Sequence, residues 1–197
     1  MSDERESGQE MEGDELAFCK AGDRLFRDAL KKKLSFAEAV DAFRRLEAEF
    51  VARAGDDDFV VLETRRRIAE YILMVADAHH PPLEVCRQAW NDLVCLGFSN
   101  IGQQRVMAWY FAECCRYDEN PEEGLAVLLP LVAELERGLE EARATQSDTD
   151  FYEYHLEPLR KLRDVLLAQR RGEQIPGKRT RRSDEARLST PEEDQTP

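Results

Sequence analysis

Apolar residues recur at intervals of three, four and seven positions along most of the chain, which is the spacing of amphipathic helices. The clearest stripe lies within residues 36–53 and consists of Phe36, Val40, Phe43, Leu46 and Phe50. Similar stripes lie at 15–33, 60–79, 83–94, 106–114, 125–139 and 159–166. No window shows the alternation or the β-branched richness of strands. The sequence therefore predicts an all-α protein of about seven helices.

Capping residues and prolines indicate where these helices begin and where they are disturbed. Ser35–Glu38 has the pattern of a capping box, in which the hydroxyl and the carboxylate satisfy free backbone N–H groups. Asn120–Glu123 combines a capping residue with proline at the first helical position, and Asn100–Gln103 can open the helix before it. Pro130 and Pro158 lie inside helical patterns, so we expect a kink or a split at each.

The two ends of the chain differ in composition from the middle. Residues 1–13 are polar and acidic, and residues 172–197 contain prolines, mixed charges and few large apolar side chains. Such segments cannot bury enough apolar surface to offset the entropy of ordering. We therefore expect two disordered tails around one α-helical domain at 14–171, which is an ordinary domain size.

Charge excludes some classes of partner. The chain has 197 residues, with 28 Lys and Arg against 41 Asp and Glu, and a formal net charge of -13 at pH 7. This balance argues against binding to nucleic acid or to membranes, which need clustered positive charge, and it favours a basic protein partner. No apolar run approaches the roughly 18 residues of a membrane span, and the acidic N-terminus lacks the order of a secretory signal. The expected compartment is the cytoplasm.

Metal-ligating residues form no strong motif. Five cysteines are spread over helical segments, and we expect them to be free, buried thiols. Asp77 and His79 are the best metal candidates, because Cys86 and Cys95 follow at the next helix. A histidine at a helix C-terminus also interacts well with exposed carbonyl groups, and this is the stronger interpretation. We expect no metal and no other cofactor.

Catalytic motifs are also weak. The sequence contains no glycine-rich phosphate loop and no nucleophile elbow. Glu153 and His155 could act as an acid–base pair only on an extended chain, because on a helix they diverge by about 200°. The sequence therefore favours a protein without catalytic activity.

Several aromatic residues are consecutive on predicted helices. Trp109, Tyr110 and Phe111 fan across about 200° of one helix, so they cannot all face the same side. Some of these rings would line a groove or a seam, where Trp and Tyr often contact partners. Burial between neighbouring helical hairpins is an equally good explanation. The candidate groove residues are Trp109, Tyr110, Tyr71 and Tyr152.

One segment resembles a known repeat family. In residues 108–131, the small residues Ala112 and Gly124 lie on two consecutive helices that a short turn separates. This arrangement resembles the tetratricopeptide repeat, in which small residues allow two antiparallel helices to approach closely. Residues 35–46, with Ala39 as the small residue, are similar to the second helix of such a hairpin.

The resemblance implies a right-handed stack of antiparallel helical hairpins. The small positions Ala39, Cys86 and Gly124 are separated by unequal intervals, both longer than the roughly 34 residues of the family's repeat. A closed helical bundle would produce much the same pattern and remains the alternative.

A stack of hairpins presents a concave face that holds peptides or helices. We therefore expect a non-catalytic adaptor that binds a segment of a partner protein in a groove between hairpins. One alternative is an acidic immunity or antitoxin-like protein that neutralises a basic toxin. Another is a metal-dependent enzyme that uses the cluster of Asp77 and His79.

Overall fold

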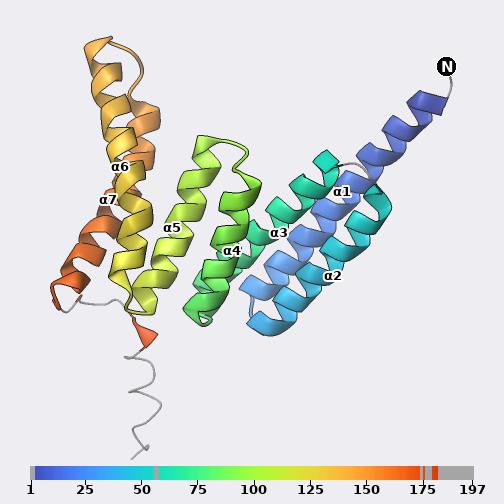
Figure 1. Cartoon of the computed structure of the whole chain (residues 1–197), viewed down its shortest axis with the longest axis horizontal. Helices are drawn as coiled ribbons and strands as arrows, with labels where there is room; N and C mark the ends of the chain where they lie inside the picture. Colours follow the sequence, from blue (N-terminus) through green and yellow to red (C-terminus); the bar gives the residue numbers. More distant parts are fainter. Residues whose placement is uncertain (1–2, 56–57, 174, 176–178, 182–197) are drawn as a thin grey trace, which may run out of the picture. The chain divides into compact units, whose positions relative to one another are not determined.

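The computed structural model describes residues 3–55, 58–173, 175 and 179–181. Within these residues the chain forms seven helices and no strand (Figure 1). The helices are α1 (Asp3–Leu30), α2 (Phe36–Ala54), α3 (Asp58–His79), α4 (Leu83–Leu96), α5 (Ile101–Tyr117), α6 (Pro121–Ala144) and α7 (Asp150–Arg170). The prediction of an all-α protein is confirmed, whereas the stacking of hairpins stays a prediction. In the described part of the chain, every helix is too short or too polar to cross a membrane.

The predicted start signals of α2 and α5 act as helix caps. The Ser35 hydroxyl accepts a hydrogen bond from the Glu38 N–H at 3.3 Å, and the Ser35 N–H donates to the Glu38 carboxylate at 2.8 Å. The Asn100 side chain accepts a hydrogen bond from the Gln103 N–H at 2.9 Å. α6 starts after Asn120, as predicted, but the Asn120 amide donates to a carboxylate of the first turn and does not cap the helix.

The predicted tails lie only partly within the described residues. α1 begins at Asp3, so the backbone of most of the predicted tail 1–13 is helical. Of residues 172–197, the structure describes 172, 173, 175 and 179–181. The remainder of both predicted tails lies outside the described residues.

The chain divides into two compact units, which are described separately. The first unit contains residues 1–81 and 85–98, and the second unit contains residues 82–84 and 99–197.

Aromatic rings fill the core of the first unit, where α1, α2 and α3 contact one another. Phe43 of α2 is completely buried, and its ring stacks on Tyr71 of α3 with a centroid distance of 5.3 Å. Phe26 of α1 also stacks on Tyr71, at 5.6 Å, and the rings of Phe18 and Phe50 lie 4.7 Å apart. The apolar stripe of α2 therefore faces neighbouring helices, as its spacing predicts.

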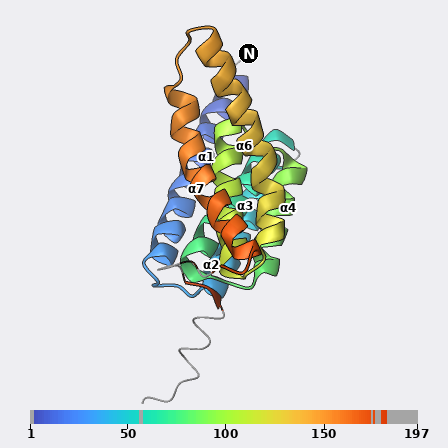
Figure 2. The ribbon, with the colours of Figure 1, turned by 90° about the vertical axis from the view of Figure 1, so that its left-hand side faces the viewer.

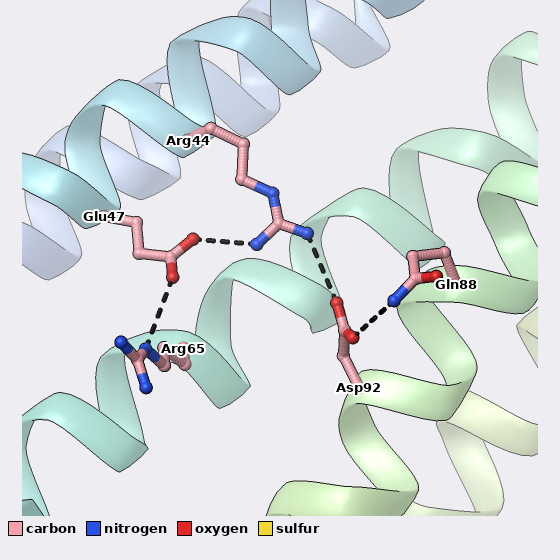
Figure 3. Close-up of polar contacts among 5 residues, drawn as sticks. All are labelled: Arg44, Glu47, Arg65, Gln88 and Asp92. Carbon is pink, nitrogen blue, oxygen red and sulfur yellow. Dashed lines mark hydrogen bonds and ion pairs between the residues drawn. The ribbon is translucent and has the colours of Figure 1, made fainter.

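A polar network joins α4 to α2 and α3 in the first unit (Figure 3). Arg44 of α2 donates to Glu47 at 2.8 Å and to Asp92 of α4 at 3.3 Å. Gln88 donates to the second Asp92 oxygen at 2.8 Å, and Arg65 of α3 lies 3.7 Å from Glu47. Exposed ion pairs contribute only about 0–1 kcal/mol each, so this network adds little to the stability of the unit. Its main effect is to fix how α4 lies against α2.

Glycine residues allow close packing in the second unit, where α5, α6 and α7 contact one another. α6 and α7 lie side by side along much of their length (Figure 2). A Cβ atom at Gly124 of α6 would lie 3.2 Å from the Cβ of Cys115 and 3.0 Å from a methyl group of Leu166. A Cβ atom at Gly138 would collide with the ring of Tyr152. Larger residues at these two positions would push α6 away from its neighbours.

Neither internal proline splits its helix. α6 continues through Pro130 and α7 continues through Pro158, so of the predicted kink or split the split does not occur, and the kink stays a prediction. Both prolines are exposed, as are Ala126 and Tyr154, the residues four positions earlier. Their carbonyl groups lack the usual helical donor but can reach water, which explains why the helices continue.

The five cysteines, all among the described residues, are not joined in disulfides, as predicted. Cys86, Cys114 and Cys115 are buried, whereas Cys19 is partly exposed and Cys95 is exposed. The expectation that all five thiols are buried is therefore corrected, because Cys95 lies on the outer face of α4.

The C-terminal residues 179–181 contact the end of α5 within the second unit. Arg116 Nη1 donates a hydrogen bond to the Arg179 carbonyl oxygen at 2.8 Å. Arg181 pairs with Asp118, and its guanidinium carbon lies 5.8 Å from the centroid of the Tyr117 ring. These contacts attach the C-terminal chain to the helical unit beyond the end of α7.

Candidate functional site

A groove opens between α5 and α7 of the second unit, with a volume of about 210 Å³. It is lined by Arg105, Val106, Trp109 and Tyr110 of α5 and by Tyr154, His155, Pro158 and Leu159 of α7. Each set has the spacing i, i+1, i+4 and i+5, which places its members on one face of a helix. The two helices thus supply two matching walls, and we call this site the α5–α7 groove.

The walls of the α5–α7 groove carry aromatic rings that remain partly open to solvent. Trp109 and Tyr110 are half-buried, and their rings meet edge to face with centroids 5.2 Å apart. Tyr154 is 77% exposed and Val106 is 43% exposed. Grouped apolar surface that stays exposed is characteristic of sites for partners or ligands.

Arg105 is the charged residue of the α5 wall. The residue is only 4% exposed, and its Nε and Nη1 atoms make no hydrogen bond. The guanidinium carbon lies 4.9 Å from the centroid of the Phe151 ring, which is a cation–π contact. Burial lowers the pKa of Arg105, although a guanidinium stays protonated at neutral pH. A buried positive charge with unused hydrogen-bond donors is therefore part of the groove.

His155 faces Arg105 from the α7 wall. Burial and then the positive charge of Arg105 lower the pKa of His155 below its usual value. The ring of His155 also lies 4.8 Å from the ring of Phe151. The imidazole is accordingly neutral at neutral pH, and it adds a polar ring to the groove without adding charge.

Two carboxylates of α7 near the groove are paired with other residues, whereas the charge of Glu134 in α6 acts on Arg105 and raises its pKa. None of the eight described residues that line the groove is acidic. On α7, Glu153 lies 3.1 Å from Arg143, and Glu157 lies 2.6 Å from Lys161. The charge at the groove wall is therefore positive, although the whole chain is strongly negative.

Pro158 leaves a backbone acceptor beside the groove. Proline has no N–H group, so the carbonyl of Tyr154, four residues earlier, lacks its usual helical donor. Both residues line the groove. The α7 wall can therefore accept a hydrogen bond from a bound backbone N–H.

Two of the four predicted groove residues, Trp109 and Tyr110, line this groove. Tyr152 lies elsewhere: it packs against Gly138 of α6, which has no side chain to obstruct the tyrosine ring.

Tyr71 belongs to the core of the first unit. It is only 7% exposed, its ring stacks on Phe43, and its hydroxyl donates a hydrogen bond to Asp23 at 2.6 Å. Burial and the neighbouring carboxylate of Asp23 raise the pKa of Tyr71. The expectation that Tyr71 contacts a partner is corrected, because neighbouring helices already cover its ring.

The metal candidates Asp77 and His79 are not brought together with further ligands. His79 Nε2 lies 2.7 Å from the Ala29 carbonyl oxygen, so this nitrogen carries a proton and donates to the end of α1. No group of three or more potential ligands among the described residues could hold a metal ion. His79 therefore contributes to helix packing, in agreement with the interpretation that the sequence favoured.

The sequence did not single out Arg105 or Pro158 as site residues. Arg105 lies one turn before Trp109 on the same face of α5, so helical spacing could have found it once Trp109 was a candidate. Pro158 and the rest of the α7 wall could not be found in this way, because their role depends on the packing of α7 against α5.

Comparison with known proteins assigns no family. No protein-family model, no curated protein and no solved structure matches the chain. The groove and its chemistry are therefore the features from which a function can be inferred.

Proposed function

We propose that this protein is a non-catalytic binding module and that its α5–α7 groove holds a segment of a partner protein. The observation that supports the proposal is the pair of facing walls, whose half-exposed aromatic residues have matched helical spacing. Trp and Tyr dominate many protein interfaces because a rigid ring buries much apolar surface at little cost in conformational entropy.

The size of the groove favours a chain segment over a metabolite. Its volume of about 210 Å³ is smaller than the roughly 300–1,000 Å³ typical of sites that enclose small molecules. Exposed apolar surface of Val106 and Tyr154 lies at its edge. A segment of a partner can place one side chain in the groove and cover this edge with its neighbours.

The partner's overall charge follows from the charge of the whole chain. A formal net charge of -13 attracts a basic protein over distances longer than direct contacts. We therefore propose a basic protein as the partner, with the bound segment held through its apolar side chains.

The test measures binding of defined peptides to the full-length protein. Peptides are selected from a random display library, labelled with a fluorophore and titrated while fluorescence anisotropy is recorded. We expect Trp109→Ala and Tyr110→Ala each to weaken binding by about 10-fold or more, because each removes a ring from the wall.

The matched control is Phe59→Ala, which removes an exposed aromatic ring from α3 in the first unit. It should change the dissociation constant by less than about twofold. If folded Trp109→Ala and Tyr110→Ala proteins bind the selected peptides as tightly as the unmodified protein, the groove is not the binding site and the proposal is wrong. Circular dichroism checks that each variant is folded.

A further inference from the structure

We infer that the α5–α7 groove recognises an acidic side chain, Asp or Glu, that lies next to an apolar side chain in the bound segment, and that Arg105 binds its carboxylate. This inference rests on the proposed function, because it names the chemistry of the segment that the groove would hold. It adds an anion-binding residue to a site otherwise described by its aromatic rings.

The hydrogen-bond donors of the buried Arg105 side chain support this inference. A charged group that is 4% exposed normally has a full set of hydrogen bonds, because burying an unpaired charge is costly. Nε and Nη1 of Arg105 have none. The Phe151 ring offsets part of this cost through its cation–π contact, and Glu134 acts only electrostatically, without an ion pair to Arg105 among the described residues. Because protein atoms cover Nε and Nη1 in the free state, a ligand carboxylate that shifts the covering side chains would supply the missing partner.

The geometry of a guanidinium also favours a carboxylate ligand. Its N–H groups form a planar fork that matches the two oxygens of a carboxylate, and such charge-assisted hydrogen bonds are stronger than neutral ones. A carboxylate carries a single negative charge, which one arginine neutralises, whereas a phosphate monoester carries about −1.5 to −2 at pH 7. The single cation of this wall therefore fits a carboxylate.

The groups that surround Arg105 fit a segment of a peptide. The rings of Trp109 and Tyr110 offer apolar contact to a neighbouring side chain, and the Tyr154 carbonyl offers an acceptor to a backbone N–H. Together these groups fit an acidic residue beside an aromatic or aliphatic residue in a peptide. Glu153 and Glu157 of α7 do not compete for Arg105, because they are paired with other residues.

A pair of small probes tests the chemistry without knowledge of the partner. 3-Phenylpropionate carries a ring and a carboxylate, and 3-phenylpropanamide has nearly the same shape without the charge. Binding is followed by Trp109 fluorescence in the full chain that carries Trp90→Phe, which leaves Trp109 as the remaining tryptophan. We expect the carboxylate to bind about 10-fold more tightly than the amide.

Variants of Arg105 show whether this preference belongs to its guanidinium. Arg105→Met should abolish the preference, and Arg105→Lys should retain part of it, because an ammonium keeps the charge but lacks the fork. Arg160→Met, which removes a partly exposed arginine of α7 that pairs with Glu136, is the matched control and should leave the preference unchanged. Equal affinity for both probes, or a preference that survives Arg105→Met, would overturn the inference. The absence of a saturable signal from 3-phenylpropionate up to roughly 20 mM would also overturn it.

Thermal unfolding separates ligand recognition from a structural role. If the Arg105 guanidinium is unpaired until a ligand binds, Arg105→Met removes an unpaired buried charge and raises the melting temperature of the free protein. A fall in melting temperature would show that Arg105 supports the fold, and the inference would be wrong.

The selected peptides distinguish failure of this inference from failure of the proposed function. We expect an Asp or Glu in these peptides, and its replacement by Asn or Gln should weaken binding about 10-fold. Peptides that need Trp109 and Tyr110 but no acidic residue would overturn the inference and leave the proposed function intact. Peptides that are insensitive to Trp109→Ala and Tyr110→Ala would overturn the proposed function.

Discussion

Glu70 of α3 carries a buried carboxyl group that makes stability depend on pH. The residue is 6% exposed, and burial raises its pKa from the usual 4.5 to about 7. The charges of Arg67 and Arg66 oppose this increase, whereas the charge of Glu63 adds to it. The Glu70 carboxyl group therefore stays protonated to a higher pH in the folded protein than in the unfolded chain.

This proton has a predictable effect on the free energy of unfolding. Below about pH 4.5 Glu70 is neutral in both states, and its contribution to stability is fully present. As the pH rises through about 7, ionisation favours the unfolded chain, and the protein loses on the order of 3 kcal/mol. Urea unfolding measured between pH 4.5 and 8 should show this loss, and Glu70→Gln should remove most of it. An identical pH profile for Glu70→Gln and the unmodified protein would contradict the prediction.

Individual side chains were the least predictable part of the site. Trp109 and Tyr110 could be chosen from sequence because consecutive rings on one helix cannot all face the same side of that helix. Tyr71 was also a candidate, but it is covered in the core by the ring of Phe43. Whether a ring is buried depends on residues that are distant in sequence, and helical spacing does not specify them.

Helix boundaries were far more predictable, because local signals set them. The capping box at Ser35 and the proline at Pro121 mark helix starts in the structure, as their chemistry requires. The α5–α7 groove was less predictable, since it needs two helices that α6 separates along the chain. Sequence identified two of the four residues of the α5 wall, Trp109 and Tyr110, whereas the α7 wall required knowledge of the packing.

The two internal prolines provide a prediction at the level of the helix. Pro130→Ala should increase the free energy of unfolding by about 1–2 kcal/mol, because it restores a hydrogen bond and a better helix former to α6. Pro158→Ala should have a similar effect on stability in α7. Chemical denaturation measures both changes, and a loss of stability in Pro130→Ala would show that the proline has a packing role.

Peptide binding should separate the two proline variants. In Pro158→Ala the new N–H can bond to the Tyr154 carbonyl, which takes this acceptor away from the groove. We expect weaker peptide binding by Pro158→Ala and unchanged binding by Pro130→Ala, whose site lies outside the groove lining.

At the scale of the whole molecule, the net charge of -13 predicts how fast a basic segment associates. A groove-binding peptide extended with lysines should associate about 10-fold faster at low salt than the same peptide extended with glutamates. The difference should shrink as salt shortens the Debye length to about 3 Å at 1 M. Stopped-flow measurements over a salt series check this. Equal association rates for the two peptides at low salt would show that the overall charge does not steer binding.

The contacts of residues 179–181 decide where the chain can be shortened. A truncation directly after α7 would remove the Arg179 carbonyl that accepts from Arg116, and it would leave Asp118 without Arg181. Arg116 is only 6% exposed, so water could not easily replace the missing acceptor. Expression boundaries, affinity tags and fused reporters therefore belong after residue 181, where they leave this anchor intact.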